Sequence, residues 1–270
     1  MALLVLTSAN GSPGVTTAAL GLAMAWPRPT VLIDADPTGA SAIPAGYFRG
    51  GQLPTDATLV DAAMAHRQGT LAEDLPRMLM PIPNTGVQFL RGPLTHAQAR
   101  VLDSLWEPFA GVLKSLERNG QDVIVDAGRL GLEGSPTKLI TAADLTLLTT
   151  RSTLPALVAA KSWADTLRDL FSRAGASSSL GVLLVGPGMP YGSTEVAKVL
   201  QIPVITSLAW DAVSAEVLSR GAAAPRNVHS SSLSKSLRAG VQSIQSTLTA
   251  SRAGLGLPDV TPELAQRSAR

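Results

Sequence analysis

The stretch Ser8-Ala-Asn-Gly-Ser-Pro-Gly-Val-Thr-Thr17 lies between an apolar run at Leu3–Leu6 and an Ala/Leu-rich segment that extends to Ala25. This order predicts a strand, a tight loop and a helix, which is the setting of a phosphate-binding loop. Glycine lets backbone N–H groups turn toward an anion, and the N-terminus of the helix adds its positive end. The stretch therefore predicts a nucleotide-binding fold.

The loop does not match the usual pattern G-x-x-x-x-G-K-[ST]. Val15 takes the place of the lysine that contacts phosphate, whereas Thr16 keeps the hydroxyl that can ligate Mg²⁺. The pattern favours nucleotide binding over efficient NTP hydrolysis, although a plain strand-to-helix turn is the alternative. The residues expected around the phosphates are Asn10, Gly11, Ser12, Pro13, Gly14, Val15, Thr16 and Thr17.

Apolar runs alternate with helical patterns along the whole chain. Most runs are nearly continuous, which is typical of strands buried on both faces of a parallel sheet. The expected strands are Leu3–Thr7, Thr30–Asp34, Val87–Leu90, Asp122–Asp126, Leu145–Thr150, Leu180–Val185 and Val204–Leu208. This alternation predicts a doubly wound α/β domain, with a mainly parallel sheet of about seven strands and helices on both faces.

Helical spacing of apolar residues marks the segments between these strands. One helix is expected to begin after Thr95 and continue to Leu116, with a kink at Pro108. Further helices are expected at Thr16–Ala25, Leu154–Phe171, Thr194–Leu200, Ala212–Arg220 and Leu233–Ser251. The apolar stripe of the last helix is expected to pack on the sheet of its own domain rather than on a partner or a membrane.

The rest of the chain is assigned to connections. The Gly- and Pro-rich segment Ala35–Thr58 is expected to be a long functional loop. One nucleotide-binding domain is expected over residues 1–252, followed by a flexible tail over residues 253–270.

The composition argues against several classes of site. The chain has no cysteine, which excludes thiolate catalysis and Cys-based zinc sites, and its three histidines lack metal-ligand spacing. No apolar run reaches the ~18–20 residues of a membrane span. No basic segment precedes the first apolar run, so a cytoplasmic protein is expected.

The C-terminal segment is basic. The segment from Arg220 onward contains seven Lys or Arg residues and two acidic residues. A basic end can contact nucleic acid or anionic lipid, whereas dispersed charges of this kind are more typical of a solvated surface.

Three carboxylates stand at the ends of expected strands, where open α/β sheets bind their ligands. Asp34 ends one strand and Asp36 follows it, and Asp126 ends another strand in the form of a Walker B motif. We expect Asp34 and Asp126 to serve a metal ion together with Thr16, and Asp36 to position a water molecule. An Asp-Pro turn and a strand that simply ends in Asp are the alternatives. The loop Val185–Gly192 is a candidate wall of a base pocket or a rigid connector.

The order of these features resembles the ParA/MinD family of deviant-Walker-A ATPases. The similarity runs from about Leu3 to Ala222 and includes Val31–Gly39, Ala142–Ala160 and Ile202–Asp211. Within that family, the resemblance is to the divergent localisation and pilus-assembly members of the CpaE/TadZ type. It implies binding of ATP and Mg²⁺, a homodimer, and a switch that acts with a protein partner in localisation, partitioning, or pilus or secretion assembly.

The chain departs from the family pattern K-G-G-x-G-K-[ST]. Asn10 replaces the lysine that reaches across a dimer, Ser12 replaces a glycine, and Val15 replaces the lysine on the phosphates. The base-contacting Asn of the family is also absent around Val185–Gly188. We therefore expect weakened nucleotide binding and slow or absent hydrolysis.

Two questions stay open at the level of sequence. Arg28, Arg129 or Arg151 could supply the missing charge, and Arg129 is the best placed because it follows Asp126 closely. The alternative function is a nucleotide-independent pseudo-ATPase scaffold for localisation or assembly. A synthetase or transferase would need a pocket with convergent charged residues, for which the sequence offers no signal.

Overall fold

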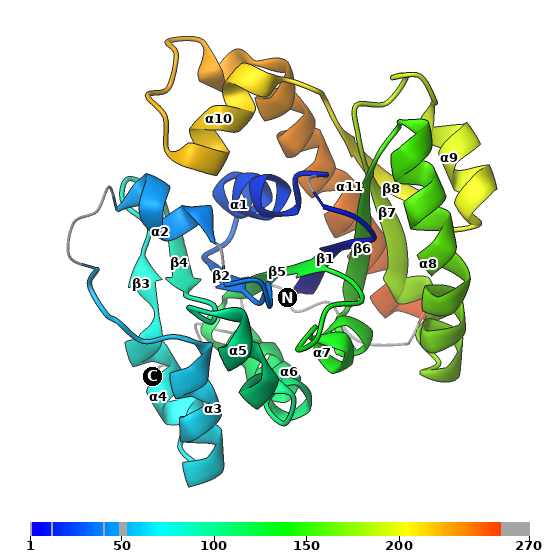
Figure 1. Cartoon of the computed structure of the whole chain (residues 1–270). Helices are drawn as coiled ribbons and strands as arrows, with labels where there is room; N and C mark the ends of the chain where they lie inside the picture. Colours follow the sequence, from blue (N-terminus) through cyan, green and yellow to red (C-terminus); the bar gives the residue numbers. More distant parts are fainter. Residues whose placement is uncertain (1, 12, 40, 49–52, 255–270) are drawn as a thin grey trace.

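The fold is built on one eight-stranded sheet in the order β3-β4-β2-β5-β1-β6-β7-β8 (Figure 1). The computed structural model describes residues 2–11, 13–39, 41–48 and 53–254. The strands are β1 (Leu3–Ser8), β2 (Thr30–Asp34), β3 (Met80–Pro81), β4 (Val87–Leu90), β5 (Asp122–Arg129), β6 (Leu145–Arg151), β7 (Leu180–Val185) and β8 (Val204–Leu208). Every neighbouring pair is parallel except β3 and β4. The predicted doubly wound α/β class is confirmed.

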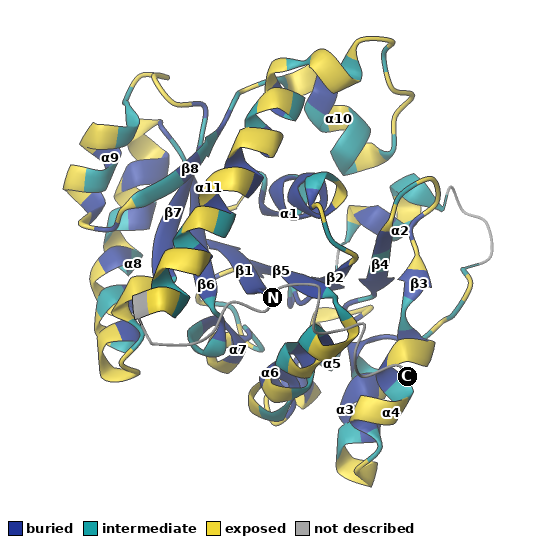
Figure 2. Ribbon diagram, turned by 180° about the vertical axis from the view of Figure 1, so that it is seen from behind, coloured by how far each residue is buried: buried dark blue, intermediate teal, exposed yellow. Residues whose placement is uncertain are grey.

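Helices cover both faces of the sheet. The longer ones are α1 (Val15–Ala25), α3 (Leu59–Gln68), α4 (Leu71–Met78), α6 (Trp106–Ser115), α8 (Leu154–Arg173), α9 (Ser193–Leu200), α10 (Ala212–Arg220) and α11 (Ser232–Gly254). Helices α1 and α11 pack on one face, and α3, α4, α6 and α8 pack on the other. The strands between them are almost wholly buried, whereas the outer sides of the helices are exposed (Figure 2).

Helix α11 packs along α1, as its apolar stripe predicts. Leu233, Leu237 and Ile244 are buried in the same cluster as the inner side of α1. The approach is close at Gly21, where a Cβ atom would lie 2.8 Å from a methyl group of Leu237. The stripe is therefore occupied by the domain's own core.

The expected single helix after Thr95 is wrong. The segment instead forms α5 (His96–Ala99), a 3-10 turn at Arg100–Leu102, and α6 (Trp106–Ser115). The chain turns before Pro108, which then lies in the first turn of α6, where its missing N–H removes no helical hydrogen bond. The proline therefore stands near the start of a helix and does not kink one.

One strand and four α-helices were not predicted, and α3, α4 and α7 (Thr137–Ala142) are among these helices. Helix α2 (Ala42–Tyr47) lies within the expected long loop, where Ser41 caps it by accepting a hydrogen bond from the N–H of Ile43 at 3.4 Å. Strand β3 has two residues and pairs only with β4, so it is too short to give an apolar run that would predict a strand. It accounts for the eighth strand.

The C-terminal end differs slightly from the expectation. Helix α11 includes residues 253 and 254, which were assigned to the tail, and the remainder of the expected tail lies outside the described residues. Within the described ranges, no helix combines the length and apolarity that a membrane crossing requires.

Candidate functional site

The candidate site lies at the carboxyl edge of the three central strands. Strand β5 stands between β2 and β1, so the end of β2, the end of β5 and the loop after β1 lie side by side. Asp34 pairs in register with Asp126, and the Thr16 hydroxyl donates a hydrogen bond of 2.5 Å to Asp126 Oδ2. The sheet therefore brings together the three residues that the sequence assigned to a metal ion.

The loop between β1 and α1 has the backbone that an anion site requires. Gly14 adopts a left-handed conformation, with φ 95°, and no side chain caps the helix that follows it. The first N–H groups of a helix have no partner within the helix, so this end of α1 presents free donors and a positive dipole. Asn10, Gly11, Pro13 and Thr17 belong to the same turn, and Ser12 lies outside the described residues.

Val15 packs in the core and has no charged group to offer this loop. Its side chain is 7% exposed and belongs to the apolar cluster between α1, α11 and the sheet. The position is thus an ordinary core position at the start of a helix. Val15 therefore contributes no charge to the loop.

Burial raises the pKa of both carboxyl groups at the strand ends. Asp34 is 5% exposed and Asp126 is 2% exposed. Desolvation, and then the facing Asp126 carboxylate, raise the pKa of Asp34 to about 7. Desolvation also raises the pKa of Asp126 to about 6, although hydrogen bonds from Thr16 and Gly128 oppose the shift.

This carboxyl pair fits a divalent cation, because a positive ion would compensate both buried charges. Within the described ranges, no group of three or more Asp, Glu, His or Cys side chains forms a metal cage. Mg²⁺ in phosphate-binding folds takes only one or two protein ligands and completes its shell with phosphate and water. Thr16 and Asp126 match that kind of site, with Asp34 next to them.

Asp36 lies at the rim of the same site. Its N–H donates to Asp34 Oδ1 at 3.2 Å, and its own Oδ1 accepts from the N–H of Thr38 at 2.9 Å. Its carboxylate packs directly on the backbone of Gly128, where an added Cβ atom would lie 2.4 Å from Asp36 Cγ. Gly128 has φ +60°, so a side chain would be strained there as well as crowded.

Gly128 is a site residue that the sequence analysis missed. Because Gly128 has no side chain, the Asp36 carboxylate can pack closely against it, and its N–H donates a hydrogen bond to Asp126 Oδ1 at 3.0 Å. The available signal was a glycine two residues after the aspartate that ends β5. Gly92, after β4, has a similar position beside Asp34, because a Cβ atom there would lie 2.7 Å from the Asp34 carbonyl oxygen.

The three candidate arginines lie in different places. Arg28 approaches Asp122, at the start of β5, with 3.7 Å between Nε and Oδ2, so it stands at the opposite edge of the sheet. Arg129 ends β5 and its side chain is exposed. Arg151 ends β6, and its guanidinium carbon lies 4.5 Å from the ring centroid of Trp210.

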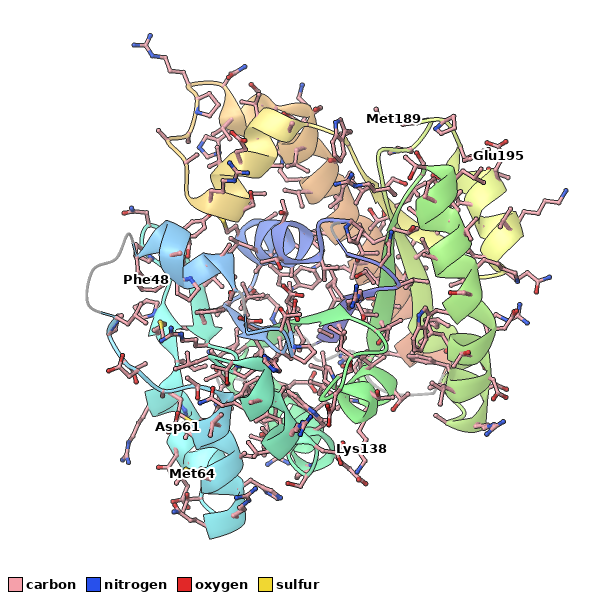
Figure 3. All side chains as sticks on the ribbon, viewed as in Figure 1. Phe48, Asp61, Met64, Lys138, Met189 and Glu195 are labelled. Carbon is pink, nitrogen blue, oxygen red and sulfur yellow. The ribbon has the colours of Figure 1, made fainter. Side chains whose placement is uncertain are left out.

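A pocket of about 320 Å³ adjoins the glycine loop on the side of β6. Gly14 and Thr17 form one wall, and the β8–α10 connection with Trp210 forms another. From the expected wall Val185–Gly192, only Val185 lines the pocket. Met189, labelled in Figure 3, is held by its neighbours: its N–H donates to Ser152 Oγ at 3.1 Å, and its sulfur lies 3.3 Å from the place that a Cβ atom of Gly186 would take.

A second hollow of about 410 Å³ lies beyond Asp34, between α2 and the end of β4. Its only charged lining residues in the described part of the chain are Asp34 and Arg91. Its other walls are mostly apolar or glycine, with Ser41 beside the carboxylate. Convergent charged groups of the kind that a synthetase or transferase would need do not meet there.

Solved structures with the same architecture are numerous, although no protein-family model and no curated protein matches the sequence. The septum site-determining protein MinD of Pyrococcus horikoshii, complexed with Mg-ADP, has a TM-score of 0.67 at 19% identity, over 90% of this chain and 96% of that one. A ParA family ATPase of Chlorobium tepidum has a TM-score of 0.68 at 17% identity, over 88% and 98%. MinD in the MinC:MinD cell division complex of Aquifex aeolicus has a TM-score of 0.68 at 14% identity, over 91% and 96%.

These likenesses cover nearly the whole of each chain and are low in identity, so they concern the fold. In this chain, the eight-stranded sheet places the loop before α1 next to the aspartates that end β2 and lie in β5. The chain therefore has the fold of the ParA/MinD-type P-loop ATPases.

Proposed function

We propose that this protein is a nucleotide-dependent switch that binds ATP with Mg²⁺ and hydrolyses it slowly or not at all. The observation that carries the proposal is the hydrogen bond between Thr16 and Asp126 beside the free N-terminus of α1. A scaffold that needed only the fold would have no reason to keep a hydroxyl, two buried carboxylates and a left-handed glycine in one place.

Each residue has a role in this proposal. The backbone of Gly11, Gly14 and Thr17 cradles the phosphates, and the other loop residues complete the turn. Thr16, Asp34 and Asp126 hold the metal ion, which supplies positive charge to the phosphate oxygens when it is bound. Asp36 positions a water molecule at the rim of the site.

Asp36 also links the site to the surface of the protein. Its carboxylate holds the N–H of Thr38, and Gly39 packs on the backbone of Leu94 and Thr95, where a Cβ atom would lie 2.9–3.0 Å away. A ligand that moved Asp36 would therefore move this surface. A ligand acts as a switch when it binds one conformation more tightly than the other.

The switch is proposed to control a homodimer or a protein partner in localisation, partitioning, or pilus or secretion assembly. The structural neighbours include a ParA family ATPase and the MinC:MinD complex, in which a protein of this fold is assembled with a partner. The exposed side chains of Lys235 and Arg238 on α11 offer a basic contact for nucleic acid.

A pseudo-ATPase scaffold is the second candidate function. The burial of Val15 in the apolar core favours it, because that position gives nothing to a phosphate. Asn10, in place of the lysine that reaches across a dimer in the resembled family, favours it as well.

Calorimetric titration with ATP and Mg²⁺, with ADP and GTP in parallel, separates the two. The test variant is Gly14→Asp, which places a negative charge at the phosphate position and should weaken ATP binding on the order of 100-fold or more. The control is Gly69→Asp, at another left-handed glycine with open space around it, at the end of α3. Absence of ATP binding up to millimolar concentration, or equal binding by Gly14→Asp and the wild type, would contradict the switch.

A further inference from the structure

Arg151 is a charged residue that lines the 320 Å³ pocket beside the glycine loop. It is the last residue of β6, and β6 runs beside β1, with Thr149 opposite Ser8. Its side chain lines the pocket together with Pro13, Gly14 and Thr17. Both the loop and the end of β6 therefore face the same space.

The surrounding structure holds the guanidinium of Arg151 in place without neutralising it. The group stacks over Trp210, at 4.5 Å from the ring centroid. Its Nε atom is buried and has no hydrogen-bond partner, and no carboxylate of the described residues pairs with the side chain. Guanidinium is a fork of N–H donors with a fixed charge, and a buried donor without an acceptor is costly.

Other cations near the pocket do not have these properties. Arg220 also lines the pocket, yet its guanidinium pairs with Glu216 at 3.6 Å on the same helix. Arg28 is at the opposite edge of the sheet beside Asp122. Arg129 is exposed at the end of β5 and does not line this pocket.

We propose that Arg151, held on the face of Trp210, supplies to the phosphate chain of the bound nucleotide the positive charge that the glycine loop lacks at Val15. The inference rests on the proposed nucleotide binding and names the residue that makes it possible. The lost lysine of the loop is thus replaced by a cation from the next strand of the sheet. The fork of Arg151 is suited to a pair of phosphate oxygens.

The test compares Arg151→Ala, Arg151→Lys and the wild type in calorimetric titrations with ATP, ADP, adenosine and tripolyphosphate. Arg220→Ala is the matched control, because it removes a paired arginine from the same pocket. Arg151→Ala should weaken ATP, ADP and tripolyphosphate about 10- to 150-fold, the loss expected for a charge-assisted hydrogen bond, and leave adenosine unchanged. Arg151→Lys should recover part of the loss.

Each other result overturns something definite. An ATP affinity that changes less than about 2-fold in Arg151→Ala, or an equal loss for adenosine and ATP, would remove Arg151 from the phosphates. If the wild type binds tripolyphosphate through Arg151 but not ATP, the proposed switch fails and the anion site stands. If the wild type binds neither, both fail. If Arg151→Ala does not fold, Arg151→Lys and Trp210→Phe are titrated with the same ligands, and ATP binding unchanged in both would overturn the proposal.

Discussion

Replacing Asp34 by Asn should stabilise the ligand-free protein at neutral pH. The substitution keeps the size and one acceptor oxygen of a buried side chain, and it removes a negative charge that faces Asp126 across β2 and β5. In the folded protein the pKa of Asp34 is raised from 3.8 to about 7, first by desolvation and then by Asp126. The folded state therefore binds a proton that the unfolded chain releases at lower pH.

The sign and the size of the effect follow from linkage. The contribution of Asp34 to the free energy of unfolding of the wild type is fully present below about pH 4. It decreases as pH rises and is lost above about pH 7. A shift of about three units corresponds to an upper bound of about 4 kcal/mol in the free energy of unfolding. We expect Asp34→Asn to gain roughly 1–4 kcal/mol at pH 8 and much less at pH 4.5.

Urea unfolding at both pH values, with EDTA and without nucleotide, measures the gain. Asp122→Asn is the matched control, because Asp122 is also buried but accepts hydrogen bonds from the N–H of Ala2 at 2.8 Å and from Trp26 Nε1 at 2.7 Å. Removing a carboxylate from these donors should cost about 1–3 kcal/mol at pH 8. The reasoning is refuted if Asp34→Asn is no more stable than the wild type at pH 8, or gains equally at both pH values.

Three further predictions concern the same edge of the sheet. Gly128→Ala should lower the free energy of unfolding by about 1–3 kcal/mol, because the added Cβ atom would lie 2.4 Å from Asp36 Cγ. In a double-mutant cycle, adding Asp36→Ala to this variant should recover part of the lost stability. Strictly additive losses would show that the two residues are not in contact. Val15→Lys should tighten ATP binding by about 10-fold or more in calorimetry. It should also lower the midpoint of urea unfolding, because it replaces an apolar core residue. An unchanged ATP affinity would mean that a lysine at this position does not reach the phosphates. Removal of Mg²⁺ with EDTA should weaken ATP binding by the wild type. The variant Thr16→Ala should bind ATP with about the same affinity with and without Mg²⁺, because it lacks the hydroxyl beside Asp126. If Mg²⁺ strengthens ATP binding by Thr16→Ala as much as by the wild type, this hydroxyl does not belong to the metal site.

The sequence by itself predicted all strands except β3, and it predicted the helices α1, α8, α9, α10 and α11. Each of the seven expected strands is present with bounds within three residues, and the helix expected at Ala212–Arg220 has those bounds in the structure. The physical reason is local: a strand that is buried on both faces must be apolar at nearly every position, and a run of that kind is visible without knowledge of its neighbours.

Two of the elements that the sequence analysis missed depend on contacts with distant parts of the chain. Strand β3 exists because β4 offers it a pairing edge, and α2 forms although Pro44 and Gly46 lie within it. The turn before Pro108 reflects the packing of Trp106 and Phe109 into the core rather than a pattern in the segment. Tertiary contacts overrode local propensity in each case.

The candidate site shows the same division. Its chemistry could be predicted from the sequence, because Thr16, Asp34 and Asp126 stand at strand ends, where ligands bind in parallel sheets. Only the sheet order, with β5 between β2 and β1, decided that the Thr16 hydroxyl and the Asp126 carboxylate lie within 2.5 Å. The stacking of Arg151 on Trp210 belongs to the same class, since it joins the ends of two strands that are not neighbours in the sheet. Side chains so far apart in the chain meet through the packing of whole strands and helices, which local periodicity does not encode.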